Sequence, residues 1–375
     1  MMVEAAQPLV QARARARESP IGPLVLALDL GASRIRAAVI ADDGTVIVRT
    51  TRSTPLAQGP EAVLGACASA LVTVRRRLPP DVGARVMAVG VAAPGPLDAA
   101  TGHLLEPPNL GPAFRGLPLG PHLSTTTGLP VAMERDTNVA ALAEQAFGSA
   151  RGCRDFLYLT VSTGIGGAIM ADGRLFRGPD GSAGELGHVT VDLDGPRCGC
   201  GAAGHLEALA SGSGIAALAR RSIAAGEAPG LAAFAARAAR TQGAAPDAAP
   251  DVDARLVAAA EAAGDPTAAA IMERARRAFA AALVSFVDVF TPRLIVIGGS
   301  LARAQGERWL RPARDAIATL AFPSAAGRTR VVPAALGDDV GLVGAVPLWR
   351  LSRDPLDPPP AAADRPRTLM EVPSL

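Results

Sequence analysis

LVLALDLGASRIRAAVIADDGTVIVRTT, residues 24–51, holds the features that decide the fold. Its first apolar run ends in a glycine turn at 29–33, which is typical of a buried strand. Two more apolar runs follow on either side of DDG (42–44), a hairpin signal. The stretch therefore predicts three consecutive antiparallel strands, and the spacing after it predicts a helix over 60–77.

A second stretch, FLYLTVSTGIGGAIMADGRLFRG (156–178), repeats this order of features, which indicates an internal duplication. Two other apolar runs end in glycine at 86–96 and 294–300, and helical spacing occurs in stretches such as 138–147 and 266–290. Strands that alternate with helices favour an α/β fold with covered sheets. Two such units facing each other would leave a cleft between them.

The composition narrows the function classes. The chain has 375 residues, enough for about two domains, and 49% of them are hydrophobic. A formal net charge of +2 is too small to favour nucleic acid or an anionic membrane as a partner. All 37 basic residues are Arg, and the absence of Lys excludes both a P-loop lysine and a Schiff-base lysine.

Targeting signals are not evident in the sequence. The first 20 residues carry charge but no apolar core of a secretory signal, and no run reaches the roughly 18 apolar residues of a membrane span. Four Cys in a chain of this length do not form a disulfide framework, which favours a cytoplasmic location. A bias toward Pro, Arg and Ala predicts disordered tails at 1–20 and 353–375.

Three glycine-containing turns are candidate phosphate sites, because small residues let backbone N–H groups approach a phosphate closely. One such turn alone is more typical of an ordinary strand end. Three in this order, two of them in the repeated unit, favour a nucleotide-binding cleft. Asp29 at the first strand end could hold Mg²⁺ directly or through water. The candidate nucleotide-binding residues are Asp29, Gly31, Ser33, Thr163, Gly164, Gly166, Gly298 and Gly299.

Several motifs carry a resemblance to a known family: DLGAS (29–33), TGIGG (163–167), LGH (186–188) with CGCGAAGHLE (198–207), and VIGGS (296–300). Their order resembles the ROK family of sugar kinases and related repressors, over about residues 24–350. The segment ELGHVTVDLDGPRCGCGAAGHLE, from Glu185 to Glu207, is the most specific part. The phosphate turns are shared with the wider hexokinase and actin-like class.

The resemblance implies an actin-like ATPase fold of the hexokinase type, with two related α/β domains around a cleft. The small N-terminal domain would comprise 21–136 with 338–352, and the large domain with the zinc motif 137–337. The resemblance also implies ATP-dependent phosphorylation of a hexose, glucose at the 6-hydroxyl being the first expectation, by a homodimer or homotetramer.

The catalytic Asp of the family falls on Asp136, in MERDTNVAALAE (133–144). A carboxylate there can take the proton of a sugar hydroxyl as it attacks the γ-phosphoryl group. Because a predicted helix begins after it, Asp136 could also be the N-cap, and the two roles are compatible. The residues that the resemblance places on the sugar side are Glu185, His188, Glu207, Asn109 and Gly95.

One structural zinc ion is also implied by the resemblance. Its cysteines fall on Cys198 and Cys200, and the histidine that faces both zinc and sugar falls on His188. His205 stands where the family has a third zinc Cys, and imidazole is an equally good zinc donor. Four protein ligands leave no open coordination position, so the ion would organise the sugar pocket and would not act as the Lewis acid.

Arg135 is a departure from the family, which commonly has Asn before the catalytic Asp, and GAS (31–33) replaces the common GGT. A guanidinium beside Asp136 would stabilise the charged carboxylate, or it could point away and pair with Glu134 or with an acid across the cleft. We expect an altered sugar preference and an active enzyme.

Other functions of the same family remain open. A transcriptional regulator needs a DNA-reading domain before the first phosphate turn, and the segment ahead of Asp29 is too short for a helix–turn–helix, so no nucleic-acid partner is expected. The second alternative is a non-catalytic sugar sensor that keeps the fold, and Arg135 is the residue that supports it. The sequence does not distinguish glucose from mannose, N-acetylmannosamine, N-acetylglucosamine or fructose, nor ATP from polyphosphate.

Overall fold

The structure is a computed structural model of the chain, and it describes residues 22–241 and 251–354. The tails predicted at 1–20 and 353–375 lie outside these ranges, except for residues 353 and 354. By their contacts the residues divide into two compact units. Of the described residues, unit 1 comprises 22–151, 174–183 and 338–354, and unit 2 comprises 152–173, 184–241 and 251–337.

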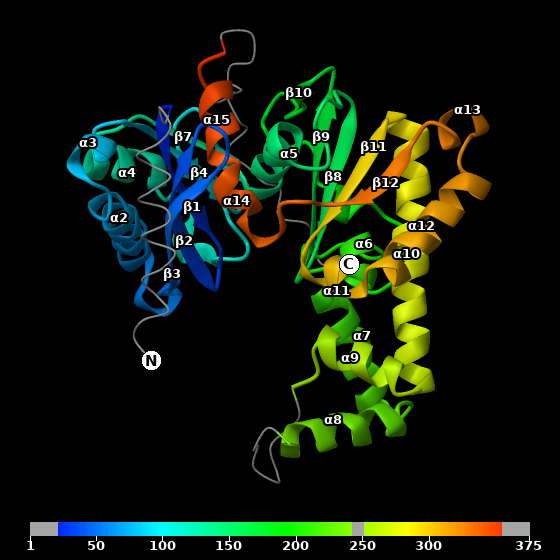
Figure 1. Ribbon diagram of the computed structural model, residues 1–375. Coiled ribbons are helices and arrows are strands. Elements are labelled where there is room, and N and C mark those ends of the chain that lie inside the picture. Colours follow the sequence, from blue (N-terminus) through cyan, green and yellow to red (C-terminus); the bar gives the residue numbers. More distant parts are fainter. Residues whose placement is uncertain (1–21, 242–250, 355–375) are drawn as a thin grey trace, which may run out of the picture. The chain divides into compact units, whose positions relative to one another are not determined.

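The sheet of unit 1 has the order β3-β2-β1-β4-β7 (Figure 1). Strands β1 and β2 and strands β2 and β3 pair antiparallel, as the opening stretch predicts. Strands β4 and β7 then extend the sheet in parallel from β1. The five strands are β1 Leu24–Leu30, β2 Arg34–Ala41, β3 Val46–Ser53, β4 Val86–Ala93 and β7 Val131–Arg135.

Helices cover both faces of this sheet, because alternate residues of β1 point to opposite sides. Leu24, Leu26 and Leu28 pack into a core with α2 (Pro60–Arg76) and α4 (Leu119–Thr127). Val25 and Ala27 pack against α14 (Val340–Val343) and α15 (Ala345–Leu351) on the other face. The remaining elements of unit 1 are η1 Leu56–Gln58, α3 Pro80–Gly83, β5 Leu97–Asp98, β6 His103–Leu104, η2 Pro112–Phe114 and α5 Asp136–Phe147.

The second sheet repeats the order of the first, as β10-β9-β8-β11-β12. Strand β9 pairs antiparallel with β8, and β11 and β12 follow in parallel, so the predicted duplication is visible in the topology. The strands are β8 Phe156–Val161, β9 Ile165–Ala171, β10 Arg174–Leu175, β11 Leu294–Gly298 and β12 Arg330–Pro333. The predicted domain boundary after residue 136 lies before α5, which by its contacts belongs to unit 1.

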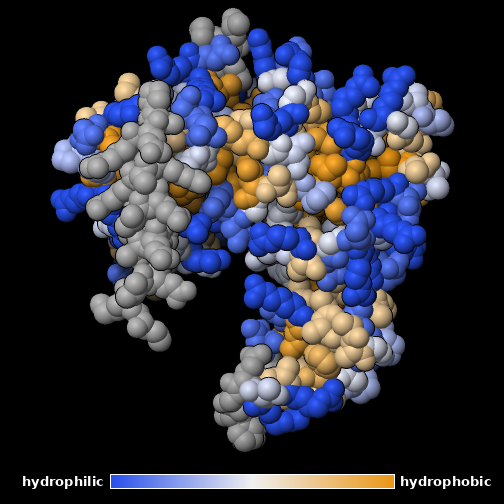
Figure 2. All heavy atoms as spheres, in the orientation of Figure 1, coloured by the Kyte–Doolittle hydropathy of each residue, from blue (hydrophilic) through white to orange (hydrophobic). Residues whose placement is uncertain are grey.

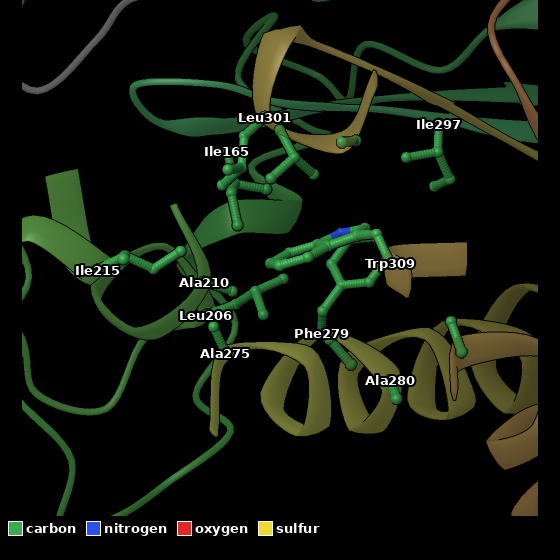
Figure 3. Close-up of a cluster of buried hydrophobic side chains, with 14 of the residues drawn as sticks. Ile165, Leu206, Ala210, Ile215, Ala275, Phe279, Ala280, Ile297, Leu301 and Trp309 are labelled. Carbon is green, nitrogen blue, oxygen red and sulfur yellow. The ribbon is translucent and has the colours of Figure 1, made fainter. Parts of the chain in front are cut away.

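The core of unit 2 lies between its sheet and a set of helices (Figure 3). Trp309 is fully buried there beside Phe279, with ring centroids 5.4 Å apart. Leu206 and Ala210 belong to the same cluster, so the short helix that carries them is anchored to the core. The other elements of unit 2 are η3 Leu186–His188, α6 Leu206–Ala210, α7 Gly212–Ala224, α8 Pro229–Thr241, α9 Ala254–Ala262, α10 Pro266–Phe290, α11 Ser300–Gln305, α12 Glu307–Leu320 and α13 Pro323–Ala326. The short η4, Gly337–Asp339, spans the boundary at which the chain returns to unit 1.

The outer faces of α10 and α12 are largely hydrophilic in the view of Figure 2. Trp309, Leu310, Ala313 and Ile317 form the buried stripe of α12, a spacing that gives a helix one apolar face. Among the described residues, none of the helices is both long and apolar enough to cross a membrane.

Candidate functional site

The first glycine turn of unit 1 lies beside a buried carboxylate. Asp29 lies near the end of β1, and its side chain is 12% exposed. Arg36 on β2 donates from Nη2 to Asp29 Oδ2 and from Nη1 to the carbonyl of Asp338. Burial raises the pKa of Asp29, and the nearby Arg36 guanidinium lowers it to a smaller extent.

The other predicted residues of this turn are held by backbone bonds. Gly31 donates its N–H to the Arg34 carbonyl at 2.9 Å, and Thr54 Oγ1 donates to the Gly31 carbonyl at 2.7 Å. The Ser33 side chain belongs to an exposed residue. Backbone bonds therefore fix the shape of the turn around the exposed Ser33.

Asp136 begins helix α5, directly after β7. The hypothesis that Asp136 is the N-cap is wrong by one residue, because Arg135 takes the extended cap conformation and Asp136 is the first helical residue. Asp136 Oδ1 accepts the N–H of Thr137 at 2.7 Å. A carboxylate in the first turn also interacts favourably with the helix dipole, by about 0.3–1 kcal/mol when exposed.

Glu134, two residues before Asp136, is buried and heavily bonded. Its Oε2 accepts from Arg177 Nε at 2.7 Å, in an ion pair whose side chains are 4% and 9% exposed. Its Oε1 accepts from the N–H of Arg135 at 2.8 Å and from Asn138 Nδ2 at 3.0 Å. These bonds fix the backbone that presents Asp136.

The Arg135 guanidinium bonds a carbonyl and an amide oxygen. It donates from Nη2 to the carbonyl of Ala183 and, at 3.5 Å, to Asn138 Oδ1. Gly95 makes room for its stem, since a Cβ at Gly95 would lie 2.7 Å from Arg135 Cδ. Gly95 thus has a packing role in addition to the sugar-side position expected of it, and Asn109 is exposed in a turn.

In unit 2 the turn between β8 and β9 is bonded to the helix that follows the Cys/His segment. Glu207 on α6 accepts the N–H of Ile165 with its Oε2 at 2.8 Å, and a Cβ at Gly164 would lie 2.6 Å from that oxygen. The Thr163 carbonyl accepts from the N–H of Ser213 at 3.0 Å. The turn that holds Thr163, Gly164 and Gly166 is therefore coupled to a residue expected on the sugar side.

The third glycine turn requires glycine for close packing. A Cβ at Gly298 would overlap the Tyr158 hydroxyl, and one at Gly299 would overlap the backbone of Val161. Gly299 also has a φ of +94°, which favours glycine. The close approach of β11 to β8 accounts for both residues.

His188, Cys198, Cys200 and His205 form one cluster, with a donor atom of each within 4.8 Å of the others. The Nδ1 atoms of the two histidines are 3.2 Å apart, Cys198 Sγ lies 3.7 Å from His188 Nδ1, and Cys200 Sγ lies 3.3 Å from His205 Nδ1. All four predicted ligands are thus brought together, and such a set could hold a metal ion.

The neighbouring acids lie around this cluster. Cys198 Sγ is 3.8 Å from Glu207 Oε1, and His188 Nε2 is 4.0 Å from Glu185 Oε2. In the protein without metal, burial raises the pKa of the Cys198 thiol to about 11, and burial followed by repulsion from His188 lowers the pKa of His205. A bound cation would oppose the first effect, because it stabilises the thiolate.

Comparison with known proteins shows to which family this chain belongs, because the model of the ROK family matches residues 25–351. The chain belongs to the ROK family. A glucokinase of Thermotoga maritima is 32% identical over 321 residues, which are 86% of this chain and 95% of that protein. An N-acetylmannosamine kinase of Citrobacter koseri is 33% identical over 323 residues, 85% of this chain and 96% of that protein.

Solved structures agree with this assignment. The crystal structure of a ROK family glucokinase from Streptomyces griseus in complex with glucose and AMPPNP matches this ROK chain with a TM-score of 0.71 at 30% identity, over 87% of this chain and 98% of that one. The predicted family and the hexokinase-type, actin-like fold class are confirmed.

Sequence reasoning missed several residues of this ROK protein that hold the predicted ones in place. Arg36 was not singled out, although it pairs with Asp29 seven residues before it. Arg177 was not connected with Glu134, from which 43 positions separate it. The bond between Glu207 and Ile165 also joins two motifs that were treated separately.

Replacement of Asp29 by Asn is expected to leave the free energy of unfolding at pH 7 equal or higher. The folded protein disfavours the charged carboxylate relative to the unfolded chain, so removal of the charge relieves that cost. Arg36 keeps its bond to the Asp338 carbonyl. Urea denaturation of both proteins measures the difference.

Asp42→Asn is the matched control for this prediction, because it removes an ion pair with Arg350 whose side chains are 48% and 49% exposed. Its effect should stay within about 1 kcal/mol. A loss of clearly more than about 1 kcal/mol in Asp29→Asn would mean that attraction to Arg36 outweighs the cost of burying the charge.

Proposed function

We propose that the protein transfers the γ-phosphoryl group of ATP to the 6-hydroxyl of glucose. The enzyme class, a hexose kinase, follows from relatives such as the Thermotoga maritima glucokinase and from the Streptomyces griseus structure. The choice of glucose and ATP is the proposal. That choice is supported by the Streptomyces griseus glucokinase complex with glucose and AMPPNP. The transfer step is carried by Asp136, which follows the buried, paired Glu134 at the N-terminus of α5.

Asp136 is the proposed general base. A sugar hydroxyl is a poor nucleophile, and a carboxylate within hydrogen-bond reach accepts its proton as the oxygen attacks phosphorus. The first residue of a helix is a rigid place for such a group, because the backbone on both sides is fixed. Asn138 Nδ2 donates to Glu134 Oε1, and this bond ties together the residues on either side of Asp136.

The glycine turns are the proposed phosphate sites. Gly31 and Ser33 in unit 1, and Thr163, Gly164 and Gly166 in unit 2, offer backbone and hydroxyl donors. Gly298 and Gly299 follow β11, where the nucleoside part of ATP is expected. Asp29 would hold Mg²⁺, which when bound neutralises charge on the phosphates, and Arg36 keeps that carboxylate oriented.

Glu185, Glu207, His188 and Asn109 are the proposed sugar-binding residues, near the loop of Gly95. Carboxylates accept strongly from sugar hydroxyls, and an epimer that leaves them unpaired is rejected. Glu207 already uses Oε2 for the Ile165 N–H, so its Oε1 is the oxygen proposed for the sugar. The same carboxylate would then connect the sugar with the phosphate turn.

The Cys/His cluster is proposed to hold one structural zinc ion. Bonds of about 2.0–2.1 Å to nitrogen and about 2.3 Å to sulfur imply distances of about 3.3–3.8 Å between the ligands of a zinc tetrahedron. The separations of 3.3 and 3.7 Å between a sulfur and a ring nitrogen lie in that range, and the 3.2 Å between the two ring nitrogens is slightly below it. The ion would supply a fixed point for His188 and Glu207, with no open position for a substrate.

N-acetylmannosamine is the second candidate substrate, because the Citrobacter koseri N-acetylmannosamine kinase is 33% identical to this chain. Fructose, mannose, polyphosphate as donor, and a non-catalytic sugar sensor are further alternatives. A dimer or tetramer, a cytoplasmic location and the lack of a nucleic-acid partner stay predictions.

A coupled kinase assay over glucose, mannose, N-acetylmannosamine, N-acetylglucosamine and fructose tests the function. ATP with Mg²⁺ and polyphosphate are compared as donors. Glucose with ATP should give the highest kcat/KM. A higher value for another sugar would reassign the substrate, and folded protein that phosphorylates none of them would favour the sensor.

Asp136→Asn should lower kcat by roughly 10²–10⁴-fold while the affinity for sugar stays close to wild type, because the variant keeps a polar group but cannot accept the proton. Steady-state kinetics and calorimetry measure the two effects. Glu61→Gln, in the first turn of α2, is the control and should leave both unchanged. Turnover of Asp136→Asn within a few-fold of wild type would remove Asp136 from the role of base.

His205→Ala should lose the zinc that wild type contains at about one ion per chain, and should raise the KM for sugar more than the KM for ATP. His205→Cys should keep the ion, since thiolate is also a good zinc ligand. Cys153→Ser, outside the cluster, is the control. Full zinc content in His205→Ala would remove His205 from the site, and active wild type without zinc would dismiss the site.

A further inference from the structure

Residues 177–183, here called the 177–183 loop, belong by their contacts to unit 1. The loop is closed on itself, because the N–H of Ala183 donates to the Arg177 carbonyl at 3.0 Å. Ser182 donates its N–H to Asp180 Oδ1 at 3.1 Å and its hydroxyl to the same oxygen at 2.5 Å. The loop is thus a small ordered body with two ends close together.

Both ends of the 177–183 loop are bonded to consecutive residues of β7. Arg177 at one end pairs with the Glu134 carboxylate, and Ala183 at the other end accepts from the Arg135 guanidinium. Asp136 directly follows Glu134 and Arg135 in the chain, and Glu185 is the second residue after Ala183. The segment that carries the proposed base therefore holds the segment that leads to a proposed sugar ligand.

The anchoring side chains are buried, which makes the attachment rigid. Arg135 is 4% exposed, and its stem fills the space that the missing side chain of Gly95 leaves. Arg177 and Glu134 are 8% and 3% exposed. Buried groups held by several bonds lose little further freedom when a ligand binds, and they keep a fixed geometry.

We propose that Arg135 and Arg177 are positioning residues that align the sugar with the base by fixing the 177–183 loop on the N-terminus of α5. Arg135 has the larger influence on sugar preference, because its bond is to the end of the loop that leads to Glu185. The family commonly has Asn at position 135, and the side chain of Asn is too short to reach the Ala183 carbonyl as Arg135 does. This inference rests on the proposed function, since it assumes the roles of Asp136 and Glu185.

Arg135→Met is the main test variant, because it keeps the stem that packs on Gly95 and removes the donors to Ala183 and Asn138. Hydrogen–deuterium exchange in the 177–183 peptide should become faster. For sugar, kcat/KM should fall on the order of 10²-fold, the size of loss that a small misplacement of reacting groups produces. The KM for ATP should stay within about twofold, and the ratios of kcat/KM among the sugars should change.

Two further variants separate positioning from general structure. Arg135→Lys keeps a donor and a charge, and it should recover part of the sugar kcat/KM and of the exchange protection. Arg177→Lys should behave likewise at the other end of the loop, whereas Arg177→Met leaves the buried Glu134 charge unpaired and is expected to fold poorly. Arg154→Met is the matched control, since it removes an arginine bonded to the Asp172 carbonyl at an exposed site.

Sugar affinity is also measured by calorimetry without ATP, so the test does not depend on turnover. Faster exchange in the loop together with weaker sugar binding in Arg135→Met supports the proposal. This holds even when the wild-type protein phosphorylates no sugar of the panel, and in that case only the proposed function fails. Unchanged exchange and unchanged sugar binding overturn the proposal. A parallel rise in the KM for sugar and ATP with a lowered Tm also overturns it, because it indicates general destabilisation.

Discussion

The buried carboxylate of Glu134 is the constraint on which the region around β7 and the start of α5 depends. A charge in this environment is costly unless every lone pair meets a donor. Arg177, Asn138 and the N–H of Arg135 supply those donors. Because the donors come from β7, α5 and the loop after β10, satisfying one carboxylate fixes three segments. Loss of a partner from a buried ion pair costs about 3–5 kcal/mol, a large part of the stability of a domain.

In unit 2, apolar packing holds a short helix in place, as the buried ion pair of Glu134 holds the segments of unit 1. Leu206 is fully buried in the core with Trp309 and Phe279, and the next residue is Glu207. The burial of one side chain therefore sets the position of its neighbour, whose carboxylate reaches the turn between β8 and β9. Full burial of a leucine stabilises by about 1.5–3 kcal/mol, enough to hold a five-residue helix that would not form alone.

The sequence predicts the strands and helices that short stretches of residues determine by their own pattern, and much of this fold consists of such elements. The apolar runs that end in glycine became β1, β4, β8 and β11, and the stretch 266–290 became α10 with the same bounds. The family resemblance also predicted the Cys/His cluster, and the structure brings its four members, which lie between residues 188 and 205, close together. The N-cap hypothesis for Asp136 failed because the extended conformation ends at Arg135, and composition alone does not locate a helix start within one residue.

What the sequence did not show are bonds between distant positions that follow no periodicity. Nothing near Arg177 marks it as the partner of Glu134, and nothing near Arg36 marks it as a bridge to the carbonyl of Asp338, 302 positions away. Gly95 looked like a ligand-side turn, yet it also accommodates the stem of Arg135. Such pairings arise only when the topology brings two strand ends together, so they require the fold before they can be found.

Because the chain has no Lys, arginine supplies the cationic side chain in all of these pairings. Every buried cation of the described residues must be a guanidinium, which offers several donors in one plane and stays charged at any physiological pH. Arg36 bonds a carboxylate and a carbonyl, Arg135 a carbonyl and an amide, and Arg276 the carboxylates of Glu261 and Glu273. Each arginine therefore cross-links two segments where an ammonium would act as a point charge. Because a guanidinium does not titrate in this range, changes of activity with pH must originate in carboxylates, thiols and histidines.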